Sequence, residues 1–491
     1  MLSSAVGRSR EGASPMPQTR NDDRVARAAG ESPHRTVDSP GVARRAEPPP
    51  LPPGSRLPSA LQTALWLRDP VGVLVRYGRR YGDIFRIGVV GVPGFVYVVD
   101  PALANRVFVT DRDIGRAGEA REGFLEPLVG SHSLLTLDGE EWMRQRKLLG
   151  SAFHGKRIER YRDEIAAIAA DHVRRWPVGE PFALRPRMQA ITLEVILRVV
   201  FGLRDVERVE RLRELLPRLT GAGESVNALA FLVPPPIWTR IEALLARVPG
   251  TPMARFAALR KATDELLYAE ISRRRTDPDL ADRIDILSVL LGARDENGHG
   301  MTDAELRDAL MTLLVAGHET TATALSWAFE RLVRHPRVTE RLRGSLAEGD
   351  EGYLDAVVKE TLRTRPIVPD MPRVLTEPLD LDGYRVPAGW WVSPSPLLLH
   401  RSADEFPEPK EFRPERFLTE DAPSQAWIPF GGGRRQCLGS HFALLEMRAV
   451  IPEVLGRLRL RVADDPAPEA PRVRNVTLAP VHDARVIAKP A

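Results

Sequence analysis

The sequence predicts a mostly helical α+β fold, and three observations carry this prediction. A helical pattern runs unbroken from Thr302 to Arg334, and a predominantly helical region covers residues 158–276. Strand-like runs are short and lie near residues 83–99, near residues 373–389 and at the C-terminus. Long helices with a few segregated strands are typical of the α+β class.

The composition indicates a globular protein of a reducing compartment. Hydrophobic residues make up 43% of the 491 residues and charged residues 28%, which permits a sizeable core. The formal net charge of +4 does not indicate a nucleic-acid partner. Cys437 is the only cysteine, which fits a reducing compartment. No apolar run reaches about 18 residues, so we expect no transmembrane segment, and no apolar signal core is present at the N-terminus.

The first part of the chain has the composition of a tail. Residues from Met1 to about Glu47 are rich in Arg, Ser, Ala, Gly and Pro and lack periodicity, which predicts disorder. The proline run at residues 48–54 is stiff and extended, as in a spacer. Translation starts at either Met1 or Met16.

Short elements follow the proline run. A helix is expected over residues 71–81, after an Asp-Pro pair. Two strand-like runs, at residues 83–90 and 95–99, are separated by a glycine- and proline-containing turn and predict a hairpin. Residues 114–134 have mixed polarity and several glycines, so we expect a long loop there. Long loops in compact folds are often functional.

A short basic helix is expected over residues 140–153. It contains Trp142 and Arg146, which are four residues apart and therefore share one face. Taken alone, this pattern favours an ordinary solvated helix with a packed tryptophan.

Prolines divide the helical region that follows. The segments are expected to end near Pro177, Pro217 and Pro249. Residues 220–238 contain two glycines and three consecutive prolines, which predicts a mobile connection between two helices.

The long helical pattern has clear ends and a weak centre. Thr302 and Glu305 form a capping box at its start, and a His-Pro pair ends it. Residues 316–321, Ala-Gly-His-Glu-Thr-Thr, put a glycine in mid-helix at a cost of about 1 kcal/mol relative to alanine. Small residues there would let a large ligand approach the backbone, and Thr320 would bond to an upstream carbonyl. The alternative is a polar patch that is solvated or paired.

A further helix and two β-rich segments follow the long helix. Residues 355–365 predict a helix on which Glu360 and Arg363 are spaced to pair. Alone, such a pair indicates only a surface ion pair of small worth. Arg373 begins a strand, and residues 476–487 alternate in a way that predicts a final hairpin.

Cys437 is the candidate ligand of a cofactor. A lone cysteine forms no internal disulfide or iron–sulfur cluster, but it suffices as the single thiolate ligand of a haem. The glycines at 431–433 allow a tight turn, and a helical pattern begins after the cysteine, where a helix N-terminus favours a thiolate. Phe430 would shield the sulfur from water, and Arg435 would meet a haem carboxylate. The alternative is a buried, inert cysteine.

The region around Cys437 resembles the haem-binding signature of the cytochrome P450 family. It matches that signature at Phe430, Gly433, Arg435, Cys437 and Gly439. The resemblance extends over most of the chain and implies haem b, with Cys437 as the axial ligand of the iron. It also implies a cytochrome P450 fold, with a long central helix over the haem and a small β-rich lobe. The catalytic domain would cover residues 56–491, after a tail and spacer over residues 1–55.

The resemblance assigns roles to residues outside the signature. Trp142 and Arg146 match a family pair that holds a haem propionate, and Arg373 would be another propionate ligand. Glu319 and Thr320 match the family's acid–alcohol pair, which delivers protons during oxygen activation; His318 would be a bystander. A structural role in the haem-side core is implied for Glu360, Arg363 and Arg416.

The activity implied by the resemblance is the O2- and NAD(P)H-dependent monooxygenation of a small lipophilic molecule, such as a fatty acid or a terpene. No flavin- or nicotinamide-binding domain fits in the remaining sequence. Electrons would therefore come from a separate ferredoxin or flavodoxin-type partner with its reductase. The protein resembles soluble bacterial members, so we expect it in the cytoplasm. Two alternatives are a peroxide-driven peroxygenase and a non-catalytic haem-binding protein.

A basic face near Cys437 is the expected docking site for an acidic ferredoxin. It would carry Arg434 and Arg448, together with Arg144 and Lys147 of the Trp142 helix. Opposite charges there would raise the association rate and make it sensitive to salt. The alternative is an ordinary solvated basic face.

Overall fold

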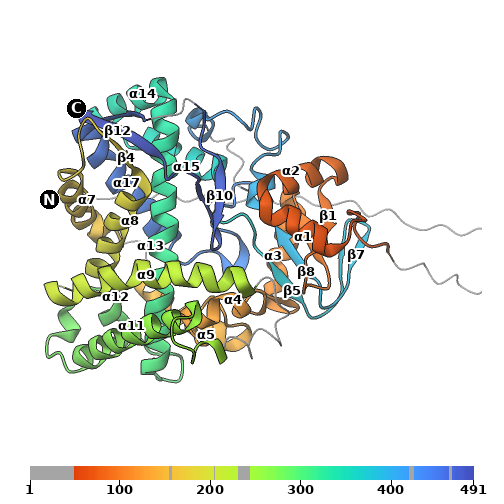
Figure 1. Cartoon of the computed structure of the whole chain (residues 1–491), viewed down its shortest axis with the longest axis horizontal. Helices are drawn as coiled ribbons and strands as arrows, with labels where there is room; N and C mark the ends of the chain where they lie inside the picture. Colours follow the sequence, from red (N-terminus) through yellow and green to blue (C-terminus); the bar gives the residue numbers. More distant parts are fainter. Residues whose placement is uncertain (1–48, 154–157, 204, 231–243, 420–424, 464–466) are drawn as a thin grey trace, which may run out of the picture. The chain divides into compact units, whose positions relative to one another are not determined.

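The computed structural model describes residues 49–153, 158–203, 205–230, 244–419, 425–463 and 467–491. Helices dominate these residues and strands are short, which confirms the predicted α+β class (Figure 1). The α-helices are α1 (Ser59–Arg68), α2 (Pro70–Tyr81), α3 (Pro101–Val109), α4 (Glu119–Val129), α5 (Gly139–Gly150), α7 (Arg162–Val173), α8 (Leu184–Val195), α9 (Val206–Ala230), α11 (Pro252–Arg275), α12 (Ile286–Gly292), α13 (Asp303–Arg334), α14 (Pro336–Ala347), α15 (Gly352–Thr364), α16 (Pro396–Leu399) and α17 (Ser440–Arg457).

Short helical turns and strands complete the fold. The helical turns are η1 (Thr110–Arg112), η2 (Ser151–Phe153), η3 (Glu159–Tyr161), the π-helical η4 (Ile196–Val200), η5 (Leu280–Asp282), η6 (Pro414–Phe417) and η7 (Gly433–Arg435). The strands are β1 (Ile84–Ile87), β2 (Phe95–Val98), β3 (Gly115–Arg116), β4 (Pro181–Ala183), β5 (Arg373–Leu375), β6 (Leu379–Leu381), β7 (Tyr384–Val386), β8 (Trp391–Pro394), β9 (Leu458–Val462), β10 (Pro471–Arg474), β11 (Thr477–Pro480) and β12 (Arg485–Pro490). Their sheets have the orders β1-β2-β8-β5-β3, β4-β12-β9, β10-β11 and β6-β7.

α13 is the predicted long helix, and its ends agree with the sequence signals. The Glu305 N–H donates to the Thr302 hydroxyl at 3.2 Å, and the Thr302 N–H donates to the Glu305 carboxylate at 2.7 Å, which completes the capping box. Every residue from Thr321 to Leu332 is buried. Figure 1 shows α13 in green, and it contacts α8, α11, α15 and α17. A helix segment that is buried all round forms the centre of the helical part.

The five-stranded sheet has an apolar layer on each face. Phe85, Phe95 and Tyr97 form one layer, with ring centroids 5.5 and 4.8 Å apart in the two stacked pairs. Val96 and Val98 belong to the other layer. This division follows from the alternation of side chains along β2, whose four residues are all buried. β2 pairs in parallel with β8 and in antiparallel with β1.

The second helix and the first hairpin match the sequence prediction, whereas α1 was not predicted. The helix expected over residues 71–81 is α2, and the Asp69 carboxylate caps it by accepting from the Gly72 N–H at 2.8 Å. The expected hairpin is formed by β1 and β2. The proline run adds backbone contacts to this region, because the Arg86 N–H donates to the Pro53 carbonyl at 2.7 Å.

The predicted loop over residues 114–134 is wrong. This region contains β3 and α4, and α4 includes Pro127 in its last turn. The mixed polarity hid an amphipathic helix whose buried residues are Ala120, Leu125 and Val129. The Pro127 carbonyl accepts a hydrogen bond from Arg260 at 2.7 Å, which satisfies one of the last carbonyls of the helix.

The predicted helix end at Pro217 is also wrong, because α9 continues to Ala230. An interior proline costs about 3 kcal/mol, yet burial of the leucine side chains on either side offsets that cost. These leucines are Leu212, Leu215, Leu216 and Leu219. The connection predicted over residues 220–238 is therefore helical up to Ala230, and its remainder lies outside the described residues.

The C-terminal hairpin was predicted with the wrong partners. β11 pairs with the preceding strand β10, whereas β12 pairs with β4 and β9. Asp483 and Ala484 both have a positive φ, 59° and 53°, and these two residues redirect the chain from one sheet to the other. No helix within the described ranges is long and apolar enough to cross a lipid bilayer.

Candidate active site

The loop that carries Cys437 is closed by its own backbone. The Cys437 N–H donates to the Phe430 carbonyl at 2.9 Å, and α17 begins three residues after the cysteine. The Cys437 side chain is accessible to solvent. Burial among the surrounding groups nevertheless raises the pKa of its thiol, while the Gly439 backbone N–H and Arg146 lower it. A nearby cation or a bound metal lowers the pKa of such a thiol and so favours its thiolate form.

Two glycines of the cysteine loop, one of them a signature residue, allow the loop to rest on α3. Gly433 has a φ of +65°, and a Cβ atom there would lie 2.9 Å from the Phe108 carbonyl oxygen. A Cβ atom on Gly432 would lie 2.5 Å from the Phe108 ring. Gly439 differs, because its φ is −86° and no heavy atom of the protein lies within 4 Å of a Cβ placed there. The packing of the chain therefore gives no reason for glycine at position 439.

The Trp142 helix and the cysteine loop meet, as the sequence predicted. The guanidinium carbons of Arg435 and Arg146 lie 4.2 and 5.8 Å from the centre of the Trp142 ring. Arg146 Nη1 also donates to the Gln436 carbonyl at 2.7 Å. Arg435 donates to the Leu137 carbonyl at 2.8 Å and pairs with Asp138. Both guanidinium groups therefore lie near the Trp142 ring, and Arg146 also contacts the loop through the Gln436 carbonyl.

Arg373 has most of its donors committed to the protein. Its Nε and Nη2 atoms donate to the two carboxylate oxygens of Asp111 at 2.6 and 3.0 Å. Its Nη1 atom donates to the carbonyls of Met371 and Pro372 at 2.9 and 3.2 Å. Of the five guanidinium N–H groups, one on Nη2 is left for a further acceptor. The proposed propionate contact of Arg373 would use this single donor.

Arg121 of α4 is a site residue that the sequence did not reveal. Within the described part of the chain it has no hydrogen-bond or ion-pair partner. Burial, followed by the nearby charges of Arg373 and Arg435, lowers its pKa to about 9. It therefore remains a cation at neutral pH. Because a loop was predicted over this region, no helix face was assigned on which Arg121 could be placed beside the other arginines.

The charges of this cluster match the acidic groups of a haem. Arg435 lies near Arg373 and Arg146, and Arg121 lies near Arg373 and Arg435. The carboxylates that act on Arg121 and Arg435 are those of Asp111 and Asp138, which leaves an excess of two positive charges. Arg435 Nη1 is buried and has no hydrogen-bond partner. The four arginines are Arg121, Arg146, Arg373 and Arg435. A haem brings two propionates, so the residues present fit this cofactor in charge and in donors.

Glu319 and Thr320 are both held in place at the centre of α13. The Glu319 carboxylate accepts from Arg185 Nη1 at 2.6 Å and from Gln189 Nε2 at 2.7 Å, both on α8. Thr320 Oγ1 donates to the Ala316 carbonyl at 2.6 Å, which is the upstream bond that the sequence predicted. The acid therefore faces α8, and a proton transfer through it requires exchange of one of these partners.

Gly317 lies where α13 packs against η4, and its role in letting a ligand approach the backbone stays a prediction. A Cβ atom there would lie 2.9 Å from Ile196 Cδ1, so the glycine allows η4 to pack closely on α13. His318 is buried, and its Nε2 atom lies 3.1 Å from the Gln189 carbonyl. Burial lowers the pKa of His318, so it is neutral at physiological pH. This contact with α8 accounts for the histidine as a packing residue.

The Glu360 network is as compact as the sequence predicted. Arg363 donates to both carboxylate oxygens of Glu360, at 2.6 and 2.8 Å, and Arg416 donates to it at 3.1 Å. Arg363 also bonds to the carbonyls of His400, Pro409 and Glu411. Glu360 and Arg363 are fully buried, so the pair is a structural element of the core.

Asp370 is a buried carboxyl group beside the five-stranded sheet. It hydrogen-bonds to Tyr97, and its Oδ1 atom is buried without a partner. Burial raises the pKa of Asp370 to about 7, although the bond from Tyr97 lowers it. The neighbouring Met371 reaches the cysteine loop, since its sulfur would lie 3.1 Å from a Cβ on Gly431.

The expected docking face is largely neutralised by ion pairs. Arg144 is held by Asp295 at 2.7 Å and by Glu305 at 2.5 Å. Lys147 pairs with Glu296 at 2.5 Å, and Arg448 pairs with Asp355. Arg434 is exposed and has no carboxylate partner among the residues that the structure describes. Of the four predicted cations, Arg434 therefore contributes most to the field at this face.

Comparison with known proteins gives one consistent result. The family model described as "Cytochrome P450" matches residues 48–483. The chain is 43% identical to "Putative cytochrome P450 135B1" of Mycobacterium tuberculosis over 446 residues, which covers 89% of this chain and 91% of the relative. It is 39% identical to "Putative cytochrome P450 135A1" of the same species over 437 residues, or 89% and 94% of the two chains.

Solved structures with the same fold are also found. The structure titled "Retinoic acid bound cyanobacterial CYP120A1" has a TM-score of 0.76 at 26% identity, with coverage of 90% of this chain and 100% of that chain. The structure titled "Crystal structure of cytochrome P450DA heme domain" has a TM-score of 0.76 at 22% identity, with coverage of 91% and 98%.

Proposed function

The chain belongs to the cytochrome P450 family of haem-thiolate monooxygenases, and we propose that it inserts one oxygen atom from O2 into a small lipophilic substrate such as a fatty acid or a terpene. We propose further that the electrons come from NAD(P)H through a separate redox partner. The observation that carries the assignment is the accessible Cys437 thiol beside four arginines with an excess of two positive charges.

The proposed cofactor is haem b, with Cys437 as the ligand of its iron. A thiolate-ligated haem supplies the oxidising chemistry, because the thiolate pushes electron density that favours O–O cleavage. Arg146 and the orphaned Nη1 of Arg435 would hold the propionates, with Arg121 and the remaining donor of Arg373. Burial keeps these cations in a weakly screened setting, where each charge-assisted bond is strong.

Glu319 and Thr320 are proposed to deliver protons during turnover. Thr320 lies next to Glu319, and its hydroxyl bonds to the helix backbone, so it is available to pass on a proton only after that bond rearranges. Glu319 would take up a proton when it exchanges Arg185 or Gln189 for water. Both side chains are therefore held by hydrogen bonds within the protein until a local rearrangement occurs.

A lipophilic substrate with an acidic end is consistent with the solved relative. That protein is described as bound to retinoic acid, which is an apolar carboxylic acid, and its chain is 26% identical to this one. The proposal concerns this broad class of substrate, because a shared fold does not fix the individual compound. A screen of fatty acids and terpenoid acids by the shift of haem absorbance would test it.

For electron delivery we propose a ferredoxin or flavodoxin-type partner with its reductase. The proposed contact lies at Arg434, the exposed cation near Cys437 that has no carboxylate partner in the described chain. Steady-state product formation with a ferredoxin and its reductase, compared with peroxide alone, distinguishes this scheme from a peroxygenase. Turnover with peroxide but none with any reductase would favour the peroxygenase.

The thiolate assignment has a direct spectroscopic test. Reduced wild-type protein with carbon monoxide should absorb at the position specific to a thiolate ligand, and Cys437→His should lose that band while retaining haem. Gln436→Ala is a matched control on the same loop, since its side chain is exposed and its contact with Arg146 uses the backbone carbonyl. An unchanged carbon monoxide spectrum in Cys437→His would contradict the assignment.

A further inference from the structure

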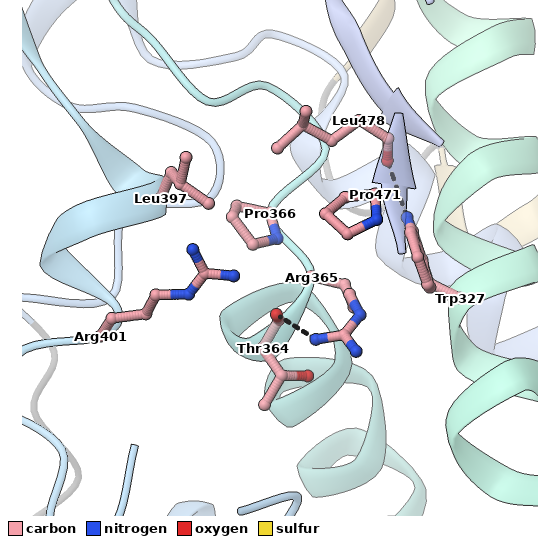
Figure 2. A pocket seen from close by; sticks show the side chains of 8 residues that line it. All are labelled: Trp327, Thr364, Arg365, Pro366, Leu397, Arg401, Pro471 and Leu478. Atoms are coloured by element: carbon pink, nitrogen blue, oxygen red, sulfur yellow. Dashed lines mark hydrogen bonds between the residues drawn. The ribbon is translucent and has the colours of Figure 1, made fainter. Parts of the chain in front are cut away.

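A small cavity lies away from the cysteine loop, between the second half of α13, the end of α15 and β10–β11 (Figure 2). It has room for about one water molecule. The side chains that line it are Trp327, Thr364, Arg365, Pro366, Leu397, Arg401, Pro471 and Leu478. Two positively charged side chains in a cavity with mainly apolar walls require a partner that offsets the cost of their burial.

Arg365 presents an unsatisfied donor at this cavity. Its Nη1 atom donates to the Thr364 carbonyl at 3.0 Å, and its guanidinium carbon lies 4.9 Å from the centre of the Trp327 ring. Its Nε atom is buried without a hydrogen-bond partner. Burial, followed by the charge of Arg331, lowers the pKa of Arg365 to about 9, so it remains a cation at neutral pH.

Arg401 enters the same cavity from the opposite side. Figure 2 shows its guanidinium group directed toward Pro366 and Arg365. Its side chain has no hydrogen-bond or ion-pair partner among the residues that the structure describes. Burial and the charge of Arg363 lower its pKa, and Arg365 and Arg401 repel each other.

The nearby carboxylates are committed to other cations. Glu330 is the carboxylate whose charge raises the pKa of Arg365. It already accepts hydrogen bonds from Arg331 and Arg334 at 2.5 and 2.6 Å. It also accepts from the Glu469 N–H at 3.1 Å. Glu360 is held by the Arg363 pair described above. The two cavity arginines therefore lack a counter-charge within the described chain.

We propose that this cavity binds a small inorganic anion of the halide class, with chloride as the physiological ion, between Arg365 and Arg401. A water molecule would satisfy the Nε donor but would leave two positive charges uncompensated. A monatomic anion accepts from several N–H donors at once and needs little more room than a water molecule. The mainly apolar walls strengthen its attraction to both arginines, because they lower the local dielectric constant. Phosphate and sulfate are too large for the space.

The bound anion would connect three parts of the fold. Trp327 belongs to α13, Pro366 follows α15, and Leu478 lies on β11, where its carbonyl accepts from the Trp327 indole at 2.7 Å. The site would therefore stabilise the native arrangement of these elements, and this role is independent of the monooxygenase chemistry.

Thermal unfolding of the holoenzyme tests the proposal. At constant ionic strength, replacement of gluconate by chloride should raise the Tm saturably, by on the order of 1–2 °C, and bromide should act likewise. Sulfate should not. Arg401→Gln should abolish the halide effect, whereas Arg459→Gln, which removes an exposed arginine paired with Glu340, should retain it. An equal Tm in chloride and gluconate, equal stabilisation by sulfate, or a full halide effect in Arg401→Gln would overturn the proposal.

Crystals of the wild-type holoenzyme soaked in bromide provide a test that does not depend on a variant that folds. The anomalous signal of bromide should show a peak between the guanidinium groups of Arg365 and Arg401. An anomalous map with bromide peaks elsewhere but none in this cavity would also overturn the proposal.

Discussion

Arg121 is a cation beside two other arginines and has no acidic partner of its own in the described chain. In the protein without haem it is therefore a destabilising charge, and we expect it to donate to a propionate when haem is bound. Arg121→Gln should raise the Tm of the apoprotein and should speed haem loss from the holoprotein about 10-fold, the equivalent of one charge-assisted bond. Transfer of haem to apomyoglobin measures the second effect.

Arg112→Gln is the matched control for Arg121, since Arg112 is exposed and lies in the neighbouring turn η1. It should change neither the Tm of the apoprotein nor the rate of haem loss. Equal rates of haem loss for Arg121→Gln and the wild type would show that Arg121 does not contact the cofactor.

Asp370 makes the stability of the protein depend on pH. Its folded pKa is about 7, above the ordinary value of 3.8, so between these two pH values the folded state binds a proton that the unfolded state has lost. Stability from this group is therefore present at low pH and falls as the pH rises toward 7. The loss amounts to no more than about 4 kcal/mol.

Asp370→Asn should remove this dependence. Urea unfolding between pH 5 and pH 8 should show the variant gaining stability relative to the wild type as the pH rises, with the difference levelling off above pH 7. Asp380→Asn, at the exposed position of strand β6, is a control for the general effect of losing a carboxylate. Parallel pH profiles for Asp370→Asn and the wild type would refute the raised pKa.

At the scale of elements, α13 joins two kinds of prediction. Its length, its capping box and its C-terminal end could be predicted from the sequence, because each depends on residues that are close together in the chain. The contacts of its centre could not be predicted, because Glu319 and Gly317 contact α8 and η4, which lie more than 100 residues earlier in the chain. The family motif predicts Glu319 and Thr320 as an acid–alcohol pair, but only the fold reveals that Arg185 holds the Glu319 carboxylate.

The centre of α13 also carries a prediction about coupling. Thr320→Ala should still bind haem and substrate, but it should lower product formed per NAD(P)H several-fold and raise peroxide release. Thr320→Ser keeps the hydroxyl group and is the matched control, so it should preserve most of the coupling. Product yield and peroxide are measured together in one turnover assay. Full coupling in Thr320→Ala would remove Thr320 from the proton path.

The elements that were predicted wrongly share a physical cause. Residues 114–134 and the helix through Pro217 contain local signals for loops or helix ends, and burial against other helices overrides them. Arg121 was missed for this reason. The cysteine loop was predicted in detail because five constrained residues lie within ten positions, so that no distant contact is needed to recognise it.

At the scale of the whole molecule, distant segments form the site and its supporting sheet. Arg435 pairs with Asp138, and Arg373 pairs with Asp111, so the haem-side cluster requires both the early and the late parts of the chain. The same holds for the anion site proposed above, which lies among α13, α15 and β11. A substitution in any of these segments is therefore expected to affect the stability of the molecule as a whole.

The parallel pairing of β2 with β8 has a consequence for synthesis on the ribosome. The two strands are separated by nearly 300 residues, with Val98 and Pro394 in register. At about 5–20 residues per second, the partner of β2 emerges roughly 15–60 s after β2 itself. During this time the nascent β1–β2 hairpin is marginally stable and presents an unpaired apolar edge. The chain must therefore pass through an aggregation-prone stage during translation, and this stage ends only when β8 has left the ribosome tunnel.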